Sequence, residues 1–273
     1  MAINYATKYS AQVDERFKLA SVTAGAVNQD YDFVGVKTVQ VYTIPTVGMG
    51  DYTREGANRY GTPTELQDTL QELEMKRDRA FTFTIDKGNN EDQMNVKDAG
   101  KALARQIDEV IVPEIDIYRL AAIAAGAGTS SAATAITKDN AYEAFLDGIN
   151  ALTDAKAPMG GRIAYISPTF YKAIRLDESF IKASDVAQNM LVKGQVGMID
   201  NVPLVLVPTS YMPTKTAFVI TNPIACCSPI KLAEYKVHDN PPGINGWLVE
   251  GRVYYDAFVL DNKKGAIYKH VTA

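Results

Sequence analysis

The side chains that most often carry out chemistry are scarce in this sequence. It contains two histidines, His238 and His270, and two cysteines, Cys226 and Cys227, which are adjacent. A serine hydrolase would need a Gly-x-Ser-x-Gly turn with a histidine partner, and a zinc site would need further cysteines or histidines at ligand spacing. The sequence has neither arrangement. Because neighbouring cysteines rarely reach disulfide geometry, we expect both to be small buried side chains in a reducing compartment.

Carboxylates occur in close pairs, which could act as acid and base or hold metal ions. The pairs are Glu91 with Asp92, Glu114 with Asp116, and Glu143 with Asp147. The last pair shares one helical face, where surface ion pairing explains it more simply. No phosphate-binding loop of the Gly-x-x-x-x-Gly-Lys-Ser/Thr type is present. The sequence therefore predicts no catalytic, cofactor or metal site, and we do not expect an enzyme.

The composition is that of a folded soluble protein without a general affinity for nucleic acid. The chain has 273 residues, 47% apolar and 22% charged, with a formal net charge of −4. A general nucleic-acid binder usually carries a strong positive charge, although a local basic patch stays open. The N-terminus lacks the features of a secretory signal, and the most apolar stretch, 120–128, is too short to span a membrane. One or two domains are expected.

Two segments in the first third of the chain have the patterns of β-strands. Residues 33–45 are rich in β-branched side chains, and their alternation changes phase between Val36 and Val39, which predicts a bulge or a strong twist. Residues 79–86 keep a strict period of two. We expect these two segments to form an antiparallel pair. Residues 1–33 have no sustained period, and we expect them to form an arm that packs on something else or a short helix around Asp14 to Leu19.

The stretch between the two strands is unusually polar. Nine of its 34 residues, 46–79, are apolar, and it carries five positive and seven negative charges. Such a long connection is uncommon in a compact domain unless it is functional or mobile. Two interpretations follow: a disordered surface loop, or a projecting two-stranded arm that neighbouring subunits order.

A long amphipathic helix is expected next. Leu103, Ile107, Ile111, Ile115 and Tyr118 recur at steps of three and four. A helix over 91–124 would be about 50 Å long at 1.5 Å per residue. We expect Asn90 to cap its start and Pro113 to kink it.

The remaining chain reads as a compact α/β unit over 139–225 followed by a strand-rich tail. The unit alternates helical patterns around 142–152 and after Ser167 with strands at 162–166, 202–208 and 218–220. The tail has strand patterns at 232–237, 247–260 and 266–271, with a turn at 262–265. The whole is therefore an α+β protein.

This order of parts resembles the tailed-phage major capsid protein family, whose Johnson fold, of the Hong Kong ninety-seven phage type, is shared with encapsulins. The resemblance covers essentially the whole chain, and four segments carry it. They are RAFTFTID at 79–86, EVIVPEIDIYR at 109–119, GMIDNVPLV at 197–205 and YDAFVLDNKKGAI at 255–267. None is specific alone, but they occur in the family's order around a polar loop of the right placement.

The resemblance implies a division of the chain into five parts. These are an N-terminal arm (1–33), an extended β-hairpin loop (34–86), a spine helix with the first part of the peripheral domain (87–138), an axial domain (139–225) and the peripheral strands (226–273). It also implies that the loop contacts neighbouring subunits through its charged residues. We name Arg54, Glu55, Arg59, Glu72, Glu74, Lys76, Arg77 and Arg79 as these contacts.

The implied function is that of a structural protein. Copies of the chain would form hexamers and pentamers of an icosahedral virion shell, made in the host bacterial cytoplasm, that encloses double-stranded DNA without binding it sequence-specifically. A portal protein and a separate scaffolding protein are implied partners, because no long charged scaffolding segment precedes residue 34; such a segment could also have been removed. No membrane partner is expected.

Two alternatives stay open at this stage. An encapsulin-like compartment shell would have the same fold with a cellular role, and a small soluble enzyme or binding module would be a monomer. Some family members cross-link covalently between Lys and Asn. Lys37 or Lys76 could be nominated here, but no residue context singles one out.

Overall fold

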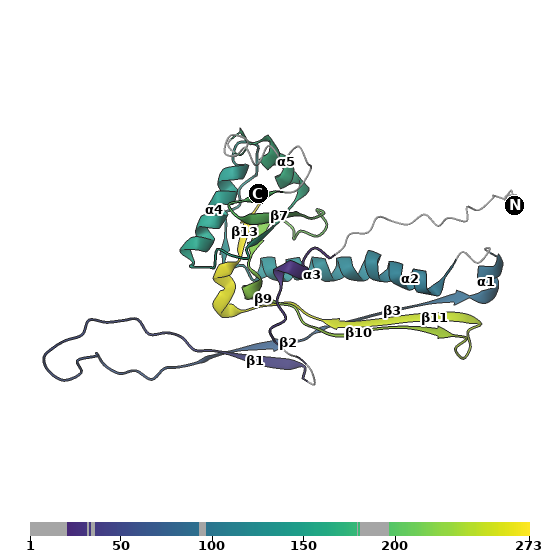
Figure 1. Cartoon of the computed structure of the whole chain (residues 1–273), viewed down its shortest axis with the longest axis horizontal. Helices are drawn as coiled ribbons and strands as arrows, with labels where there is room; N and C mark the ends of the chain where they lie inside the picture. The colour runs from purple at the N-terminus through teal and green to yellow at the C-terminus, as the bar shows by residue number, and fades with distance from the viewer. Residues whose placement is uncertain (1–20, 32, 34–35, 93–96, 179, 181–196) are drawn as a thin grey trace.

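The computed structural model describes residues 21–31, 33, 36–92, 97–178, 180 and 197–273. Three parts are visible in Figure 1: a long helix lying on a narrow sheet, a compact α/β unit mounted over one end of that helix, and a loop that extends away from both. No helix among these residues is long and apolar enough to cross a membrane.

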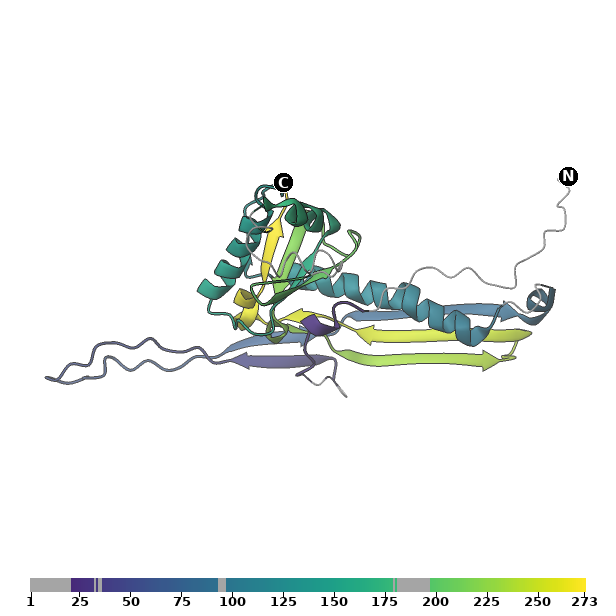
Figure 2. The ribbon, with the colours of Figure 1, turned by 45° about the horizontal axis from the view of Figure 1, so that its top comes forward.

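The extended loop is a two-stranded stalk with an irregular outer part. Strand β1 (Thr38–Thr43) pairs antiparallel with β2 (Thr69–Glu74) in an unbroken register. Residues 44–68 continue outward without helix or strand (Figures 1 and 2). The expected pairing of 33–45 with 79–86 is therefore wrong, and the predicted bulge is absent from 38–43. The sequence pattern gave each strand's buried face but not its partner, and the nearer strand closes the hairpin.

The second strand of the predicted pair belongs to a different sheet. Strand β3 (Arg77–Asp86) pairs along its whole length with β11 (Gly246–Tyr255), and β11 pairs with β10 (Ile230–Asp239), all antiparallel. The period of two in β3 places Phe81, Phe83 and Ile85 on one face of the strand, and Phe81 lines a small hollow there together with Ile111 and Ile115 of the long helix. The other face is exposed.

The long helix is divided into segments, which differs from the prediction of one continuous helix over 91–124. A short helix α1 (Lys87–Asp92) follows β3, and α2 (Ala99–Gln106), a π-helical turn η2 (Ile107–Ile111) and α3 (Val112–Ala125) follow after it. The cap of α2 is Asp98, whose side chain accepts a hydrogen bond from the Lys101 amide, so the expected cap at Asn90 is wrong.

The π-turn has a simple physical cause in Pro113. Proline has no N–H for the carbonyl four residues back, and its ring crowds that carbonyl. The turn immediately before it widens, and the Val112 amide donates to Ile107, five residues back. The helix thus accommodates Pro113 through a wider turn, and α3 begins directly after it. The expected kink at Pro113 stays a prediction.

The compact unit has a six-stranded sheet in the order β4-β13-β8-β5-β7-β6. The strands are β4 (Thr129–Ser130), β5 (Ile163–Ile166), β6 (Met198–Ile199), β7 (Val202–Leu206), β8 (Thr216–Thr221) and β13 (Tyr268–Val271). Helices α4 (Ala141–Asp154) and α5 (Pro168–Leu176) pack on the sheet, and Ser167 caps α5. These helices and strands confirm the expected α/β pattern.

The core of this unit is aromatic. Phe218 is fully buried and contacts Phe145, Phe170 and Tyr268, with ring centroids 4.6 to 6.0 Å apart. The last strand, β13, is paired with β8 here, although the sequence placed 226–273 with the peripheral strands.

Short elements connect the compact unit with the rest. They are η1 (Ala24–Ala26), η3 (Pro223–Ala225), β9 (Cys226–Cys227), β12 (Phe258–Val259) and η4 (Asp261–Ala266). The element η4 occupies the place of the predicted turn at 262–265. Strands β9 and β12 pair with each other beneath the end of α3.

Candidate functional site

The residues most suited to chemistry lie apart from one another. His238 is exposed on β10, with its Nε2 atom 3.3 Å from Oε2 of Glu250. His270 is buried on β13 and stacks on Phe218. Both cysteines are buried and free, and burial raises the pKa of Cys226 to about 11, so its thiol stays protonated near neutral pH.

The two carboxylates of the pair Glu114 and Asp116 contact different partners. Glu114 accepts from Arg77 at 3.2 Å and lies 2.9 Å from Nε of Arg79. Asp116 is buried and bonded to residues 21–23 instead. Among the described residues no group of three or more His, Cys, Asp or Glu side chains could hold a metal ion. The geometry therefore directs attention to surfaces.

The eight charged residues predicted to contact neighbouring subunits fall into three separate places. Arg54, Glu55 and Arg59 are near the tip of the extended loop, Glu72, Glu74 and Lys76 are on or next to its stalk, and Arg77 and Arg79 begin β3. The structure does not gather them into one patch.

Five of these eight residues pair with side chains of the same chain, and Arg59 donates from Nε to the Gly56 carbonyl at 3.1 Å. Glu72 accepts from Gln40, and Glu74 lies 2.7 Å from Nζ of Lys37 and 3.6 Å from Nζ of Lys76. The Lys37 ammonium lowers the pKa of Glu74, first by hydrogen bonding and then by its charge. Arg77 and Arg79 pair with Glu114, as described above. These five therefore brace the loop on its own subunit.

The tip of the loop has a structure of its own. Tyr52 and Tyr60 meet edge to face, with centroids 5.0 Å apart, and the Thr53 amide donates to the Arg59 carbonyl at 3.1 Å. The turn between them uses positive φ at Gly56 (84°) and Asn58 (57°), a region that favours glycine and asparagine. The conformation of the tip is thus fixed by contacts within the loop itself.

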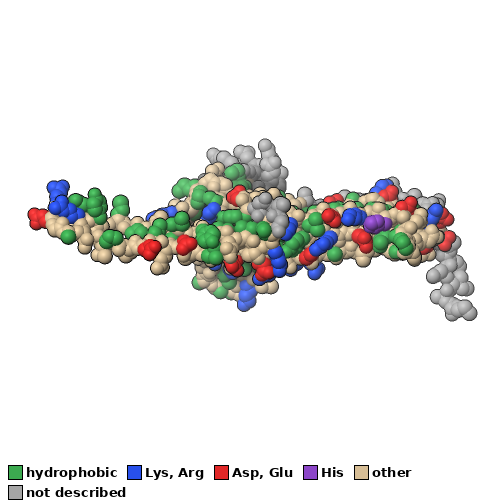
Figure 3. Space-filling view, turned by 90° about the horizontal axis from the view of Figure 1, so that it is seen from below, with side chains coloured by type: hydrophobic (Ala, Val, Ile, Leu, Met, Phe, Trp, Pro, Cys, Tyr) green, Lys and Arg blue, Asp and Glu red, His purple; other side chains and the backbone are tan. Residues whose placement is uncertain are grey.

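Apolar side chains on the loop are the feature that sequence analysis missed. Val47 is 70% exposed, Tyr60 is 94% exposed and Met49 is fully exposed. Figure 3 shows hydrophobic side chains standing on the projecting loop. The low apolar content of 46–79 drew attention to its charges, and the exposure of the few apolar residues it contains was not considered.

The body of the subunit carries hollows among its described residues. One of about 420 Å³ follows the exposed side of the spine helix, with Val110, Pro113, Ile117 and Ala121 along it and Arg77, Glu109, Glu114 and Tyr118 around it. Val110 and Ile117 are 45% and 38% exposed, so an apolar stripe remains uncovered there.

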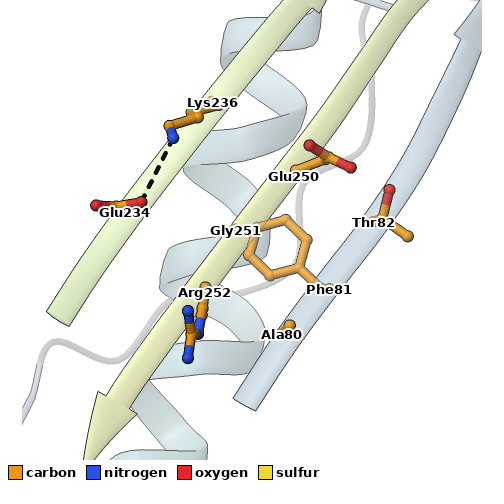
Figure 4. Close-up of a pocket in the computed structure, with 8 residues that line it drawn as sticks. All are labelled: Ala80, Phe81, Thr82, Glu234, Lys236, Glu250, Gly251 and Arg252. Carbon is orange, nitrogen blue, oxygen red and sulfur yellow. Dashed lines mark ion pairs between the residues drawn. The ribbon is translucent and has the colours of Figure 1, made fainter. Parts of the chain in front are cut away.

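The second hollow, also about 420 Å³, lies over the middle of the three-stranded sheet. Figure 4 shows its lining: Ala80, Phe81, Thr82, Glu234, Lys236, Glu250, Gly251 and Arg252. Charges of both signs surround it, including Glu234 and Lys236 at 3.4 Å, and they are interspersed along the whole face in Figure 3. A side chain at Gly251 would collide with the Phe81 ring, which explains a glycine at this place.

Comparison with known proteins identifies this architecture. The family model described as phage capsid protein matches residues 74–269, which is most of the chain. The chain belongs to the phage capsid protein family. It is a structural component of a phage capsid, as the resemblance implied, and neither the encapsulin nor the enzyme alternative is favoured.

Solved phage structures share the fold over almost the whole chain. A chain of Mycobacterium phage Che8 is 16% identical with a TM-score of 0.72, and the alignment covers 97% of this chain and 96% of that one. The capsid of cyanophage P-SCSP1u is 14% identical with a TM-score of 0.76, and the alignment covers 98% of this chain and 93% of that one. The capsid of Myoviridae phage XM1 gives 13% and 0.66, covering 98% and 97%.

The predicted fold class, an α+β capsid fold of this type, is confirmed by these structures. No curated protein sequence matches significantly.

Proposed function

We propose that this capsid protein is the repeating subunit of an icosahedral head around double-stranded DNA, and that its extended loop lies across a neighbouring copy. The observation that supports the proposal is the exposed apolar surface of 44–68. Burying a side chain the size of Val47 or Met49 completely contributes about 1.5–3 kcal/mol. Over many identical contacts, this surface would supply the association energy that the isolated subunit leaves unused.

The charges of the loop have a different role in this proposal. Exposed ion pairs contribute little each, typically under about 1 kcal/mol. Arg54, Glu55 and Arg59 at the tip would set the register between copies, while the stalk and base charges hold the loop in its direction. The chain acts in this proposal as a structural protein without a catalytic step.

The remaining partners follow from the same proposal. Copies would form hexamers and pentamers, with a portal protein and a separate scaffolding protein, in particles made in the host bacterial cytoplasm. The net charge of −4 suits a shell that encloses DNA without binding it tightly. The division into arm, extended loop, spine, axial and peripheral parts is retained, with 268–271 joined to the axial sheet.

Shortening the loop tests this proposal. Replacing residues 46–66 with Asn-Gly keeps both strands of the stalk and the buried Leu73 and Met75. We expect the variant to unfold at the same denaturant concentration as the wild type, but to elute as small particles where the wild type forms shells or tubes under the electron microscope.

Two results would contradict the proposal. Shells of normal shape from the shortened variant would show that the loop is not needed. A wild type that stays monomeric at high concentration, and also with the other head proteins of its phage, would show that it does not build shells.

A further inference from the structure

A strap formed by residues 21–28 crosses the end of the spine helix and is held there by a buried carboxylate. Asp116, only 1% exposed, accepts hydrogen bonds from the Ser21 hydroxyl at 2.8 Å, the Val22 amide at 3.0 Å and the Thr23 hydroxyl at 2.5 Å. Three consecutive residues of the strap therefore donate hydrogen bonds to one side chain.

A buried cation lies on the other side of Thr23. Arg119, 5% exposed, donates from Nη1 to the Thr23 hydroxyl oxygen at 3.4 Å and from Nε to the Ser228 hydroxyl at 2.8 Å. One hydroxyl thus accepts from the guanidinium and donates to the carboxylate. Burial lowers the pKa of Arg119, and the negative charge of Asp116 opposes this shift. Removing either charge would leave the other buried without a counter-charge.

Beyond Thr23 the strap runs along β9. The Asn28 amide donates to Cys226 at 2.8 Å, the Ser228 amide donates to Asn28 at 3.1 Å, and the Asn28 side chain donates to Pro223 at 2.8 Å. Further on, Phe33 stacks on Phe258 in a small core that also holds Leu73 and Met75 at the base of the extended loop. The strap therefore touches the spine helix at one end and leads into the loop base at the other.

We propose that Thr23, Asp116 and Arg119 form a lock that holds the strap in place and so fixes the direction in which the extended loop leaves the subunit. A hydroxyl is required at position 23, because only a group that donates and accepts at once satisfies both buried charges. Serine meets this requirement and valine, which has the same shape as threonine, does not. The assembly part of this inference rests on the proposed function, and the lock itself does not.

The test compares Thr23→Val with Thr23→Ser by hydrogen–deuterium exchange of the isolated full-length subunit. We expect exchange in the peptide over 21–31 to become about tenfold faster, or more, in Thr23→Val, because losing the lock exposes amides that strap contacts protect. Thr23→Ser should stay close to the wild type. Thr84→Val makes the same chemical change on the exposed face of β3 and should leave this peptide unchanged.

Assembly is measured on the same proteins. We expect Thr23→Val shells to be open or of mixed size, and Thr23→Ser shells to be regular. If Thr23→Val does not fold, Ser21→Ala, which removes one of the three bonds to Asp116, should give a smaller increase in exchange.

Each outcome decides one part. Unchanged exchange in Thr23→Val, or in Ser21→Ala if it must replace it, overturns the lock. Faster exchange with regular shells overturns its role in directing the loop. A wild type that forms no shells, even with the other head proteins of its phage, overturns the proposed function and leaves the exchange comparison to judge the lock.

Discussion

The compact unit buries its large apolar side chains, whereas the extended loop exposes several of its own. In the compact unit Phe145, Phe170 and Phe218 are buried against one another within one chain. In the loop Met49 and Tyr60 lie in solvent, although the backbone around them is shaped. A folded subunit normally keeps exposed apolar groups scattered. The first region therefore stabilises the subunit, and the exposed apolar groups of the second support the proposal that it contacts neighbouring subunits.

The largest effect on stability is expected from a substitution in the core of the compact unit. Phe218→Ala removes a fully buried ring and should lower the free energy of unfolding by about 3–5 kcal/mol. Denaturant titration followed by fluorescence or circular dichroism measures this. A loss below about 1 kcal/mol would mean that the compact unit is not the stabilising part.

A smaller effect is expected from pH, through the buried histidine of the same core. Burial lowers the pKa of His270, while the Thr134 carbonyl and Asp147 oppose the shift. Its Nδ1 has no hydrogen-bond partner among the described residues, so a second proton would be buried unpaired.

The sign follows from proton binding. In the unfolded chain His270 takes up a proton near the ordinary histidine pKa of about 6.5, and in the folded chain it does so only at lower pH. Stability is therefore complete above about pH 6.5 and falls as the pH drops below it. Melting temperature should fall from about pH 7.5 to about pH 5.5, and it should fall less in His270→Gln. His238→Gln, on the exposed sheet face, is the control and should keep the wild-type profile.

The smallest effect on stability is expected in the loop. Met49→Ser combined with Tyr60→Ser should change the free energy of unfolding by no more than about 0.5 kcal/mol, because neither side chain is buried in the subunit. The same variant should lose most shell assembly, measured by light scattering and microscopy. Full assembly by this variant would erase the distinction between the two regions.

Much of the architecture could be predicted from local patterns. The period of two in 79–86, the steps of three and four through 103–118, and the low apolar content of 46–79 each depend on neighbouring residues. They indicate which face of an element is buried, and their order along the chain resembled the right family. The prediction of the contact residues remains open; it named charged residues, and the exposure of the apolar ones became visible only in the structure.

What the amino-acid sequence determined by itself was the type and order of the elements, since periodicity is a local property. The tertiary structure alone decided their partners: β3 pairs with β11, whose residues are far along the chain, and Arg77 and Arg79 pair with Glu114 rather than with a neighbour. It also decided that Thr23 meets Asp116 and Arg119. Such contacts depend on which surfaces the whole chain brings together, and a local pattern shows that a face will be covered without showing by what.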